Sequence, residues 1–358
     1  MKLRFTITIL LICLSLFSQT NNRYQQVRHW FPFPFLAYSN ETSLIYGGII
    51  IYDTAHSKEN YEGQWSNVIQ HSLKNQFRYI TKANFSFQDD YATSFALRTK
   101  KWPTSIYEFG NNSNIDSETK YTELENSFEF DLYRRIYKQL YLGVNAEIGH
   151  LKVTKRKENQ YIDWNNTLGS DGGWLNGIGS VLKLDTRNFV NYPSRGLYYR
   201  LSFRKYDPNW ASNYQFGMTE IDLKNYFSTS PNLILATHLD AKITHGDVPL
   251  QRLAKLGDRL RGFTSRRFMD NHRISGRAEI RTSPFTNGIY TRAGFVVFLE
   301  AGKVAHEIDQ LNLSDLKLSY GTGFRYKLTN SEDKLNMRFD IAFTEEGHSI
   351  GISAYEEF

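Results

Sequence analysis

Apolar and polar residues alternate with a period of two from about residue 43 to the end of the chain. In the clearest run, every second residue is apolar and the residues between are mostly polar or charged. The apolar members of this run are Leu335, Met337, Phe339, Ile341 and Phe343. Alternation that continues for about ten positions indicates a β-strand with two unlike faces. The sequence therefore predicts long two-faced strands.

The length of these runs separates two kinds of all-β protein. Strands of soluble proteins average about five to six residues, whereas tilted membrane-spanning strands need about 9 to 11. The predicted strands are 43–54, 64–74, 76–88, 91–101, 121–135, 141–154, 176–187, 196–206, 214–228, 231–244, 274–285, 289–302, 315–328, 334–344 and 349–358. Because single-chain bacterial barrels have an even number of strands, we expect a sixteenth from 31–38 or from 103–110.

The connections between these strands differ in length. Short turns are expected on the periplasmic side, and the long connections are expected to be external loops at 55–63, 155–175, 207–213, 245–273 and 303–314. An unpaired backbone group in lipid costs several kcal/mol, so strands that span a bilayer must close into a barrel. The predicted fold class is all-β, an antiparallel transmembrane β-barrel of 16 strands.

The first residues predict export. Lys2 and Arg4 precede an apolar run from Phe5 to Phe17, which is too short for a membrane helix but suits a signal peptide. We assign 1–19 to the signal peptide, 20–42 to a short periplasmic segment and 43–358 to the barrel; an anchor that stays attached is the alternative. The only cysteine is Cys13, so the exported part is expected to have no disulfide and no cysteine-based metal site.

Composition narrows the class further. Aromatic residues make up 15% of the chain, as expected of a membrane barrel with aromatic girdles or of a soluble all-β protein. The net charge is +6, and we interpret it as a charged lumen and charged loops rather than a nucleic-acid-binding patch. The bacterial outer membrane is the predicted location, and its lipid is the predicted partner of the barrel surface.

Several motifs between residues 185 and 358 occur in a recognisable order. They are Asp185-Thr186-Arg187, Tyr192-Pro193-Ser194-Arg195-Gly196, Arg261-Gly262-Phe263, Phe298-Leu299-Glu300-Ala301-Gly302 and a final Phe358. This set resembles the signature of the BamA/TamA-type assembly barrels, the bacterial surface antigen superfamily. The resemblance implies that the external loop 245–273 folds into the lumen and carries an Arg-Gly-aromatic tip. It also implies a role in the assembly, insertion or translocation of outer-membrane proteins.

The charges near the loop tip agree with this interpretation. Alternation places Glu279 and Glu300 on the inward faces of their strands, where they could hold the Arg261 guanidinium by charge-assisted hydrogen bonds. Gly262 would let the backbone pass close to the wall, next to Phe263. We predict that these five residues hold the loop in the lumen. The alternative is that the charges line a wet lumen without specific pairing. Glu300 stands where the family pattern has Asp, which adds one methylene to the pairing.

The end of the chain resembles the assembly signal of outer-membrane barrels. Ile350, Ile352 and Phe358 fall on one face of the last predicted strand, so we assign them to this signal. Typical members of the family carry periplasmic modules that capture substrates before the barrel. We expect that partner proteins supply such modules here; the alternative is a simpler function that needs none.

Other functions fit less well. No serine lies near His238 or His245 to suggest a hydrolase, and no residue pattern indicates a metal or another cofactor, so we expect no enzyme activity. The leading alternative to assembly is a passive channel or transporter for small solutes. A third possibility is a structural barrel whose external loops bind a partner.

Overall fold

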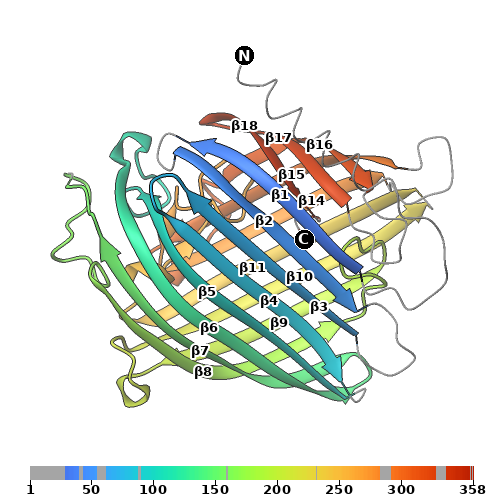
Figure 1. Cartoon of the computed structure of the whole chain (residues 1–358), viewed down its shortest axis with the longest axis horizontal. Coiled ribbons are helices and arrows are strands. Elements are labelled where there is room, and N and C mark those ends of the chain that lie inside the picture. The colour runs from blue at the N-terminus through green and yellow to red at the C-terminus, as the bar shows by residue number, and fades with distance from the viewer. Residues whose placement is uncertain are drawn as a thin grey trace.

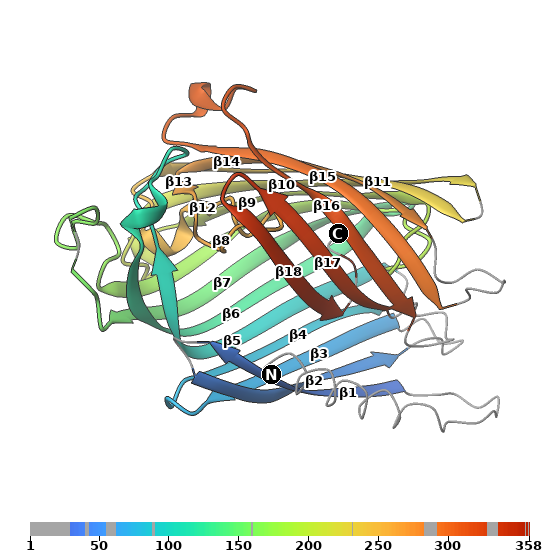
Figure 2. The ribbon, with the colours of Figure 1, turned by 90° about the horizontal axis from the view of Figure 1, so that it is seen from above.

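The computed structural model shows a single large antiparallel sheet that curls into a barrel (Figures 1 and 2). It describes residues 29–39, 43–54, 62–87, 90–158, 160–230, 232–282, 292–327, 336–354, 356 and 358. The sheet has 16 strands, and each pairs with its neighbours in chain order. A second sheet of two short strands, β12 and β13, lies in the connection between β11 and β14. The predicted fold class is confirmed.

The strands agree closely with the alternation in the sequence. They are β1 (His29–Ser39), β2 (Ser43–Thr54), β3 (Glu62–Ser72), β4 (Phe77–Phe87), β5 (Tyr91–Ile106), β6 (Thr119–Tyr137), β7 (Leu140–Thr154), β8 (Gly172–Asp185), β9 (Gly196–Tyr206), β10 (Phe216–Ser230), β11 (Leu233–Gly246), β12 (Ala254–Lys255), β13 (Met269–Asp270), β14 (His272–Thr282), β15 (Ala293–Ala305), β16 (Lys317–Lys327), β17 (Asn336–Thr344) and β18 (Gly347–Ala354). Short 3-10 turns are η1 (Ile115–Ser117), η2 (Pro208–Trp210), η3 (Leu250–Arg252) and η4 (Ile308–Gln310). No helix in the described ranges has the length and apolar character needed to cross a membrane.

The sixteenth strand is the first one in the chain. β1 pairs with β2 along its whole length, from His29 to Ser39, so the barrel begins before residue 43. The predicted periplasmic segment 20–42 is therefore wrong for residues 29–39. The other candidate, 103–110, contributes only an extension of β5 to Ile106. The predicted signal peptide lies outside the described residues.

Two prolines explain why β1 is hard to recognise in the sequence. Pro32 and Pro34 lie inside this strand and pair in register with β2. Proline cannot donate to a ladder and is confined to edge strands, with its nitrogen away from the partner. We infer that both proline nitrogens face the edge of β1 that β2 does not cover. In the described residues β1 and β18 are each hydrogen-bonded to one neighbour in this sheet, so together they form a seam between the two ends of the sheet.

The burial of side chains is the reverse of that in a soluble protein. On β15, the side chains of Phe295, Val297 and Leu299 are 59, 62 and 56% exposed. Glu300, on the opposite face of the same strand, is fully buried. Ile280 on β14 is exposed in the same way, next to the buried Glu279. Apolar side chains that cover the outer face and charged side chains that pack inside are typical of a membrane barrel.

Antiparallel order decides which connections share an end of the barrel. The connections after β5, β7, β9, β11 and β15 leave from one end, and those after β2, β4, β6 and β10 leave from the other. The prediction that 55–63 is external together with 155–175 is therefore wrong, because the first follows β2 and the second follows β7. This error arose because loop length alone was used to assign the side. Residues 55–61 themselves lie outside the described residues.

Candidate functional site

Arg261 lies between β12 and β13 in the connection from β11 to β14, and it contacts three strands of the wall. Its Nε donates to Oε1 of Glu300 at 2.8 Å, and its backbone N–H donates to Oε2 of the same carboxylate at 2.6 Å. Its Nη2 lies 2.5 Å from Oε1 of Glu279, and its Nη1 lies 3.2 Å from Oδ2 of Asp340. Carboxylates from β14, β15 and β17 thus converge on one guanidinium inside the barrel.

The charges around this contact are balanced by further arginines. Arg281 Nε lies 2.6 Å from Oε2 of Glu279, and Arg325 Nη1 lies 2.6 Å from Oδ1 of Asp340. The Arg261 guanidinium also lies over the ring of Phe298, 3.4 Å from its centroid. Burial alone would lower the pKa of Arg261, but the neighbouring carboxylates outweigh it and raise the pKa above its ordinary value. The guanidinium therefore stays charged.

The structure brings the predicted residues together. Arg261, Glu279 and Glu300 meet as the sequence analysis expected, and the longer Glu300 side chain reaches both the backbone and the side chain of Arg261. Asp340 was not predicted as a partner of Arg261. Its place in the cluster follows from the path of the loop, which the alternation of a single strand does not reveal.

Gly262 and Phe263 fix the position of the loop tip. Gly262 has φ +99°, a conformation that L side chains rarely adopt. A Cβ atom at this position would lie 2.6 Å from Cγ2 of Thr344 on β17, so the backbone comes as close to the wall as glycine allows. Phe263 packs edge-on against Phe268, with ring centroids 5.3 Å apart, in a cluster that includes Val304 of β15.

Four other arginines of the same connection also bind the wall. Arg252 contacts Glu147 of β7, Arg259 lies 2.8 Å from Asp240 of β11, Arg266 lies 2.8 Å from Glu123 of β6, and Arg267 lies 2.5 Å from Glu346 beside β18. The sequence analysis missed these contacts. The available signal was the density of arginines in the predicted loop 245–273, which are Arg252, Arg259, Arg261, Arg266, Arg267 and Arg273.

The turn between β8 and β9, which carries two of the recognised motifs, is also built by specific contacts. Arg187 forms a bidentate pair with Asp185, with Nε–Oδ1 at 2.9 Å and Nη2–Oδ2 at 2.7 Å. Tyr192 is fully buried and its hydroxyl donates to the backbone oxygen of Thr282, at the end of β14. This turn therefore contacts the end of β14, which lies beyond β10 and β11 in the strand order.

The predicted assembly signal is only partly in the expected place. Ile350 and Ile352 are exposed on the outer face of β18, as predicted. Phe358 does not extend this strand, because β18 ends at Ala354 and the Phe358 ring is buried against Tyr226 and Ala236 on the inner face of the barrel. The prediction that Phe358 ends the last strand is wrong.

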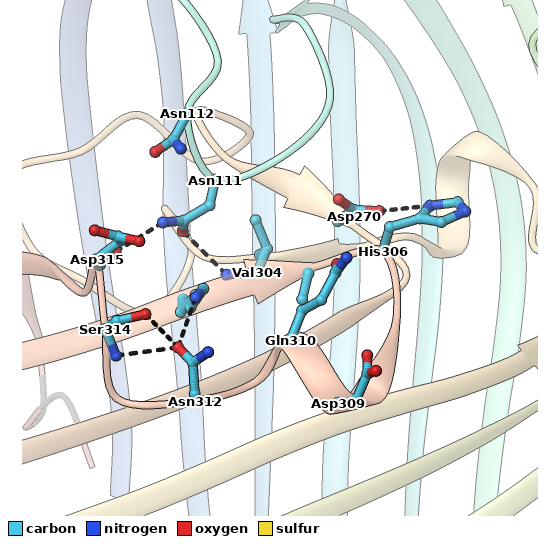
Figure 3. Close-up of a pocket in the computed structure, with 12 residues that line it drawn as sticks. Asn111, Asn112, Asp270, Val304, His306, Asp309, Gln310, Asn312, Ser314 and Asp315 are labelled. Carbon is cyan, nitrogen blue, oxygen red and sulfur yellow. Dashed lines mark hydrogen bonds and ion pairs between the residues drawn. The ribbon is translucent and has the colours of Figure 1, made fainter.

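A polar recess opens at the external end, between the connections that follow β5 and β15 (Figure 3). It encloses about 420 Å³. Asn111 donates from Nδ2 to the backbone oxygen of Asp315 at 2.8 Å and accepts from the backbone N–H of Val304 at 3.2 Å. The labelled polar groups thus bond largely to one another, and we interpret the recess as the place where two external loops are tied together.

The structure offers little for metal chemistry. In the part of the chain that it describes, no group of three or more His, Cys, Asp or Glu side chains is placed to hold a metal ion. His238, the best-placed histidine in the sequence, lies 2.9 Å from Asp222 and is buried in the wall. No site for a cofactor was predicted from the sequence.

Comparisons with known proteins agree with this architecture. The Omp85 superfamily domain matches residues 61–349. BamA from Haemophilus ducreyi lacking POTRA domains 1-3 is similar in structure, with a TM-score of 0.58 and 13% identity, over 92% of this chain and 70% of that one. CdiB from Escherichia coli has a TM-score of 0.61 and 10% identity over 94% of this chain. CdiB from Acinetobacter baumannii has a TM-score of 0.55 and 13% identity over 93% of this chain. The chain spans 63% and 60% of these two CdiB chains. None of the curated proteins that were compared matches the chain.

Proposed function

We propose, because this chain belongs to the Omp85 superfamily, that its barrel inserts, assembles or translocates outer-membrane proteins by offering an open sheet edge to their strands. Membership places the barrel in the bacterial outer membrane, among assembly and translocation proteins. The single observation that carries the proposal for this chain is the seam. In the described residues β1 and β18 each have a hydrogen-bonded neighbour on one side only.

The chemistry of an edge strand explains how this seam would act. A strand with unpaired N–H and C=O groups is a template for pairing with another strand. Pro32 and Pro34 remove two donors from β1, so pairing of β1 with β18 would be weaker than pairing between other neighbours. A substrate strand that supplies acceptors and donors in a better register could replace β18 beside β1.

The loop contacts support the same mechanism. We propose that Arg261, Gly262 and Phe263, together with Glu279 and Glu300, latch the β11–β14 connection inside the lumen. A loop held there would keep the lumen blocked to solutes while the seam opens. Removing one partner of a buried ion pair typically costs about 3 to 5 kcal/mol, so Glu279 and Glu300 are expected to favour the state in which Arg261 stays in the lumen. Ile350 and Ile352 would present the outer apolar face of β18 to lipid.

Partners are part of the proposal. Residues 29–354, as far as the structure describes them, form the barrel strands and their connections. We propose that a partner protein supplies the periplasmic module that captures substrates and delivers them to the seam.

Depletion in cells tests the function. If the chain assembles or translocates outer-membrane proteins, its loss should lower the surface level of a defined set of them, measured by quantitative proteomics of purified outer membranes. In a matched experiment, the depleted protein is replaced by its Arg261→Ala variant and the same outer-membrane proteins are measured. Normal levels of all outer-membrane and secreted proteins after depletion would contradict the proposal.

Conductance separates this proposal from a passive channel. With the loop latched inside, the purified protein in planar bilayers should give small and flickering currents. Large and steady openings of the unmodified protein would favour a channel for small solutes, because the open lumen of a 16-stranded barrel conducts ions.

A further inference from the structure

The segment that follows β18 leaves the wall and enters the lumen. β18 ends at Ala354, and Glu356 lies inside the barrel. Its carboxylate accepts from Nε of Arg325 at 2.8 Å and from Nδ2 of Asn336 at 2.6 Å. Arg325 and Asn336 come from β16 and β17 and are fully buried. The carboxylate thus has a built site on the inner wall.

Phe358 occupies a second site two residues further on. Its ring packs against Tyr226 of β10 and Ala236 of β11, and its centroid lies 5.1 Å from that of the His238 ring. Nη2 of Arg281 donates to the backbone oxygen of Phe358 at 3.1 Å, and the same guanidinium lies 4.9 Å from the ring centroid. Both the ring and the backbone of this residue are recognised.

The two sites lie on strands that are well separated in the sheet. β10 and β11 are separated from β18 by β14, β15, β16 and β17 in the strand order. Glu356 and Phe358 therefore bind different parts of the inner wall, β16 and β17 in the first case and β10 and β11 in the second. Alternation explains why it cannot continue as a strand: Ile350 and Ile352 face outward, and Glu356 would follow them on the outer face.

We propose that this pair of sites is a lumenal binding site for an acid–x–aromatic peptide segment, filled in this chain by Glu356 and Phe358. Filling the site holds the end of β18 inside the barrel and keeps the strand short at the seam. Release of the segment removes these lumenal contacts and leaves the end of β18 held only by its pairing with β17. The consequence for substrate strands rests on the proposed function, but the binding site itself does not.

A photo-crosslink tests whether the site is filled. We replace Phe358 with p-benzoylphenylalanine, which keeps an aromatic ring, in the full-length protein in native membranes. Irradiation should join residue 358 to peptides of β10 and β11 that contain Tyr226, Ala236 or His238, identified by mass spectrometry. The same group at Ile352, which faces outward, should give no such product. Crosslinks from residue 358 to β1 or to lipid alone would overturn the proposal.

Cysteine labelling tests what holds the segment. A cysteine at Ala236, which is fully buried beneath Phe358, is exposed to a hydrophilic maleimide in lipid nanodiscs. Adding Phe358→Ala should speed its labelling roughly 10- to 100-fold, because the ring that covers it is lost. Phe358→Tyr should restore slow labelling, and Ile352→Ala should leave the rate unchanged. Equal rates with Phe358→Ala and with the parent would overturn the proposal.

The two proposals fail in different ways. If the crosslink and the labelling behave as expected but depletion leaves all outer-membrane proteins at normal levels, the binding site stands and the assembly function falls. If depletion has its expected effect but residue 358 does not crosslink to β10 or β11, the function stands and the binding site falls.

Discussion

The wall formed by β5, β6 and β7 and the seam between β1 and β18 are built from the same kind of strand but are held in different ways. β5, β6 and β7 are 16, 19 and 15 residues long and pair on both sides, whereas β17 and β18 have 9 and 8 residues. Arginines of the β11–β14 connection bind β6, β7, β11, β14, β15 and β17. At the seam, β1 carries two prolines and β18 ends at Ala354, after which Glu356 and Phe358 contact the inner wall. Long ladders stabilise the wall, whereas the ladder between β17 and β18 is short. Arg261 and Arg267 also bind Asp340 and Glu346 on that side, so it is the ladder length that distinguishes the seam.

Removal of the loop should have the largest effect. Replacing residues 250–268 with a short Gly/Ser linker takes away all five arginines and the cluster around Phe263. We expect the small flickering currents of the parent to become large and steady in planar bilayers, because the lumen is no longer filled. A conductance equal to that of the parent would show that the loop does not block the lumen.

Arg261→Ala should cost more than any other single change in the loop. It leaves the buried carboxylates of Glu279 and Glu300 without their main partner, which typically costs about 3 to 5 kcal/mol. Protease cleavage within 247–271 should become faster, and the thermal midpoint should fall. The matched control is Arg259→Ala. The Arg259 side chain is 37% exposed, and without it Asp240 still forms an ion pair with Arg273. Because Arg259 is half-exposed and Asp240 is left with a second arginine, its loss should cost less than that of Arg261. Equal cleavage of the two variants would remove Arg261 from the latch.

Gly262→Ala should destabilise the loop tip by about 1 to 3 kcal/mol, because alanine is strained at this φ. It also places a Cβ against Thr344, so adding Thr344→Ser should recover part of the loss. Gly351→Ala is the control, since a Cβ there meets nothing within 4 Å. Loop protection can be followed by hydrogen exchange, and an unchanged exchange rate in Gly262→Ala would contradict the close approach.

Restoring donors at the seam should have the smallest effect. Pro32→Ala and Pro34→Ala each return one N–H to β1, worth about 1 kcal/mol if it pairs with β18. Amide exchange in β18 should then slow by roughly 5-fold per substitution. The control is Pro103→Ala in β5, which is far from the seam in the strand order and should leave the rate of amide exchange in β18 unchanged. Unchanged exchange in β18 would mean that the prolines do not weaken the seam.

The sequence predicted the strands well because alternation is a property of each strand alone. β1 was recognised only as one of two options, since its prolines break the usual strand pattern. The contact of Arg261 with Glu279 and Glu300 could be predicted because a family resemblance supplied the path of the loop. The contacts of Arg252, Arg266 and Arg267 could not, since their partners Glu147, Glu123 and Glu346 lie far from the loop in the sequence. Phe358 was misplaced because alternation gives no sign of where a strand ends and the chain turns inward.

The spread of arginine anchors over six strands has a mechanical consequence. A loop anchored to six strands resists an increase in the circumference of the sheet between β6 and β17. We expect this part of the sheet to keep its curvature, so that movement is concentrated in the strands that no arginine of the connection holds.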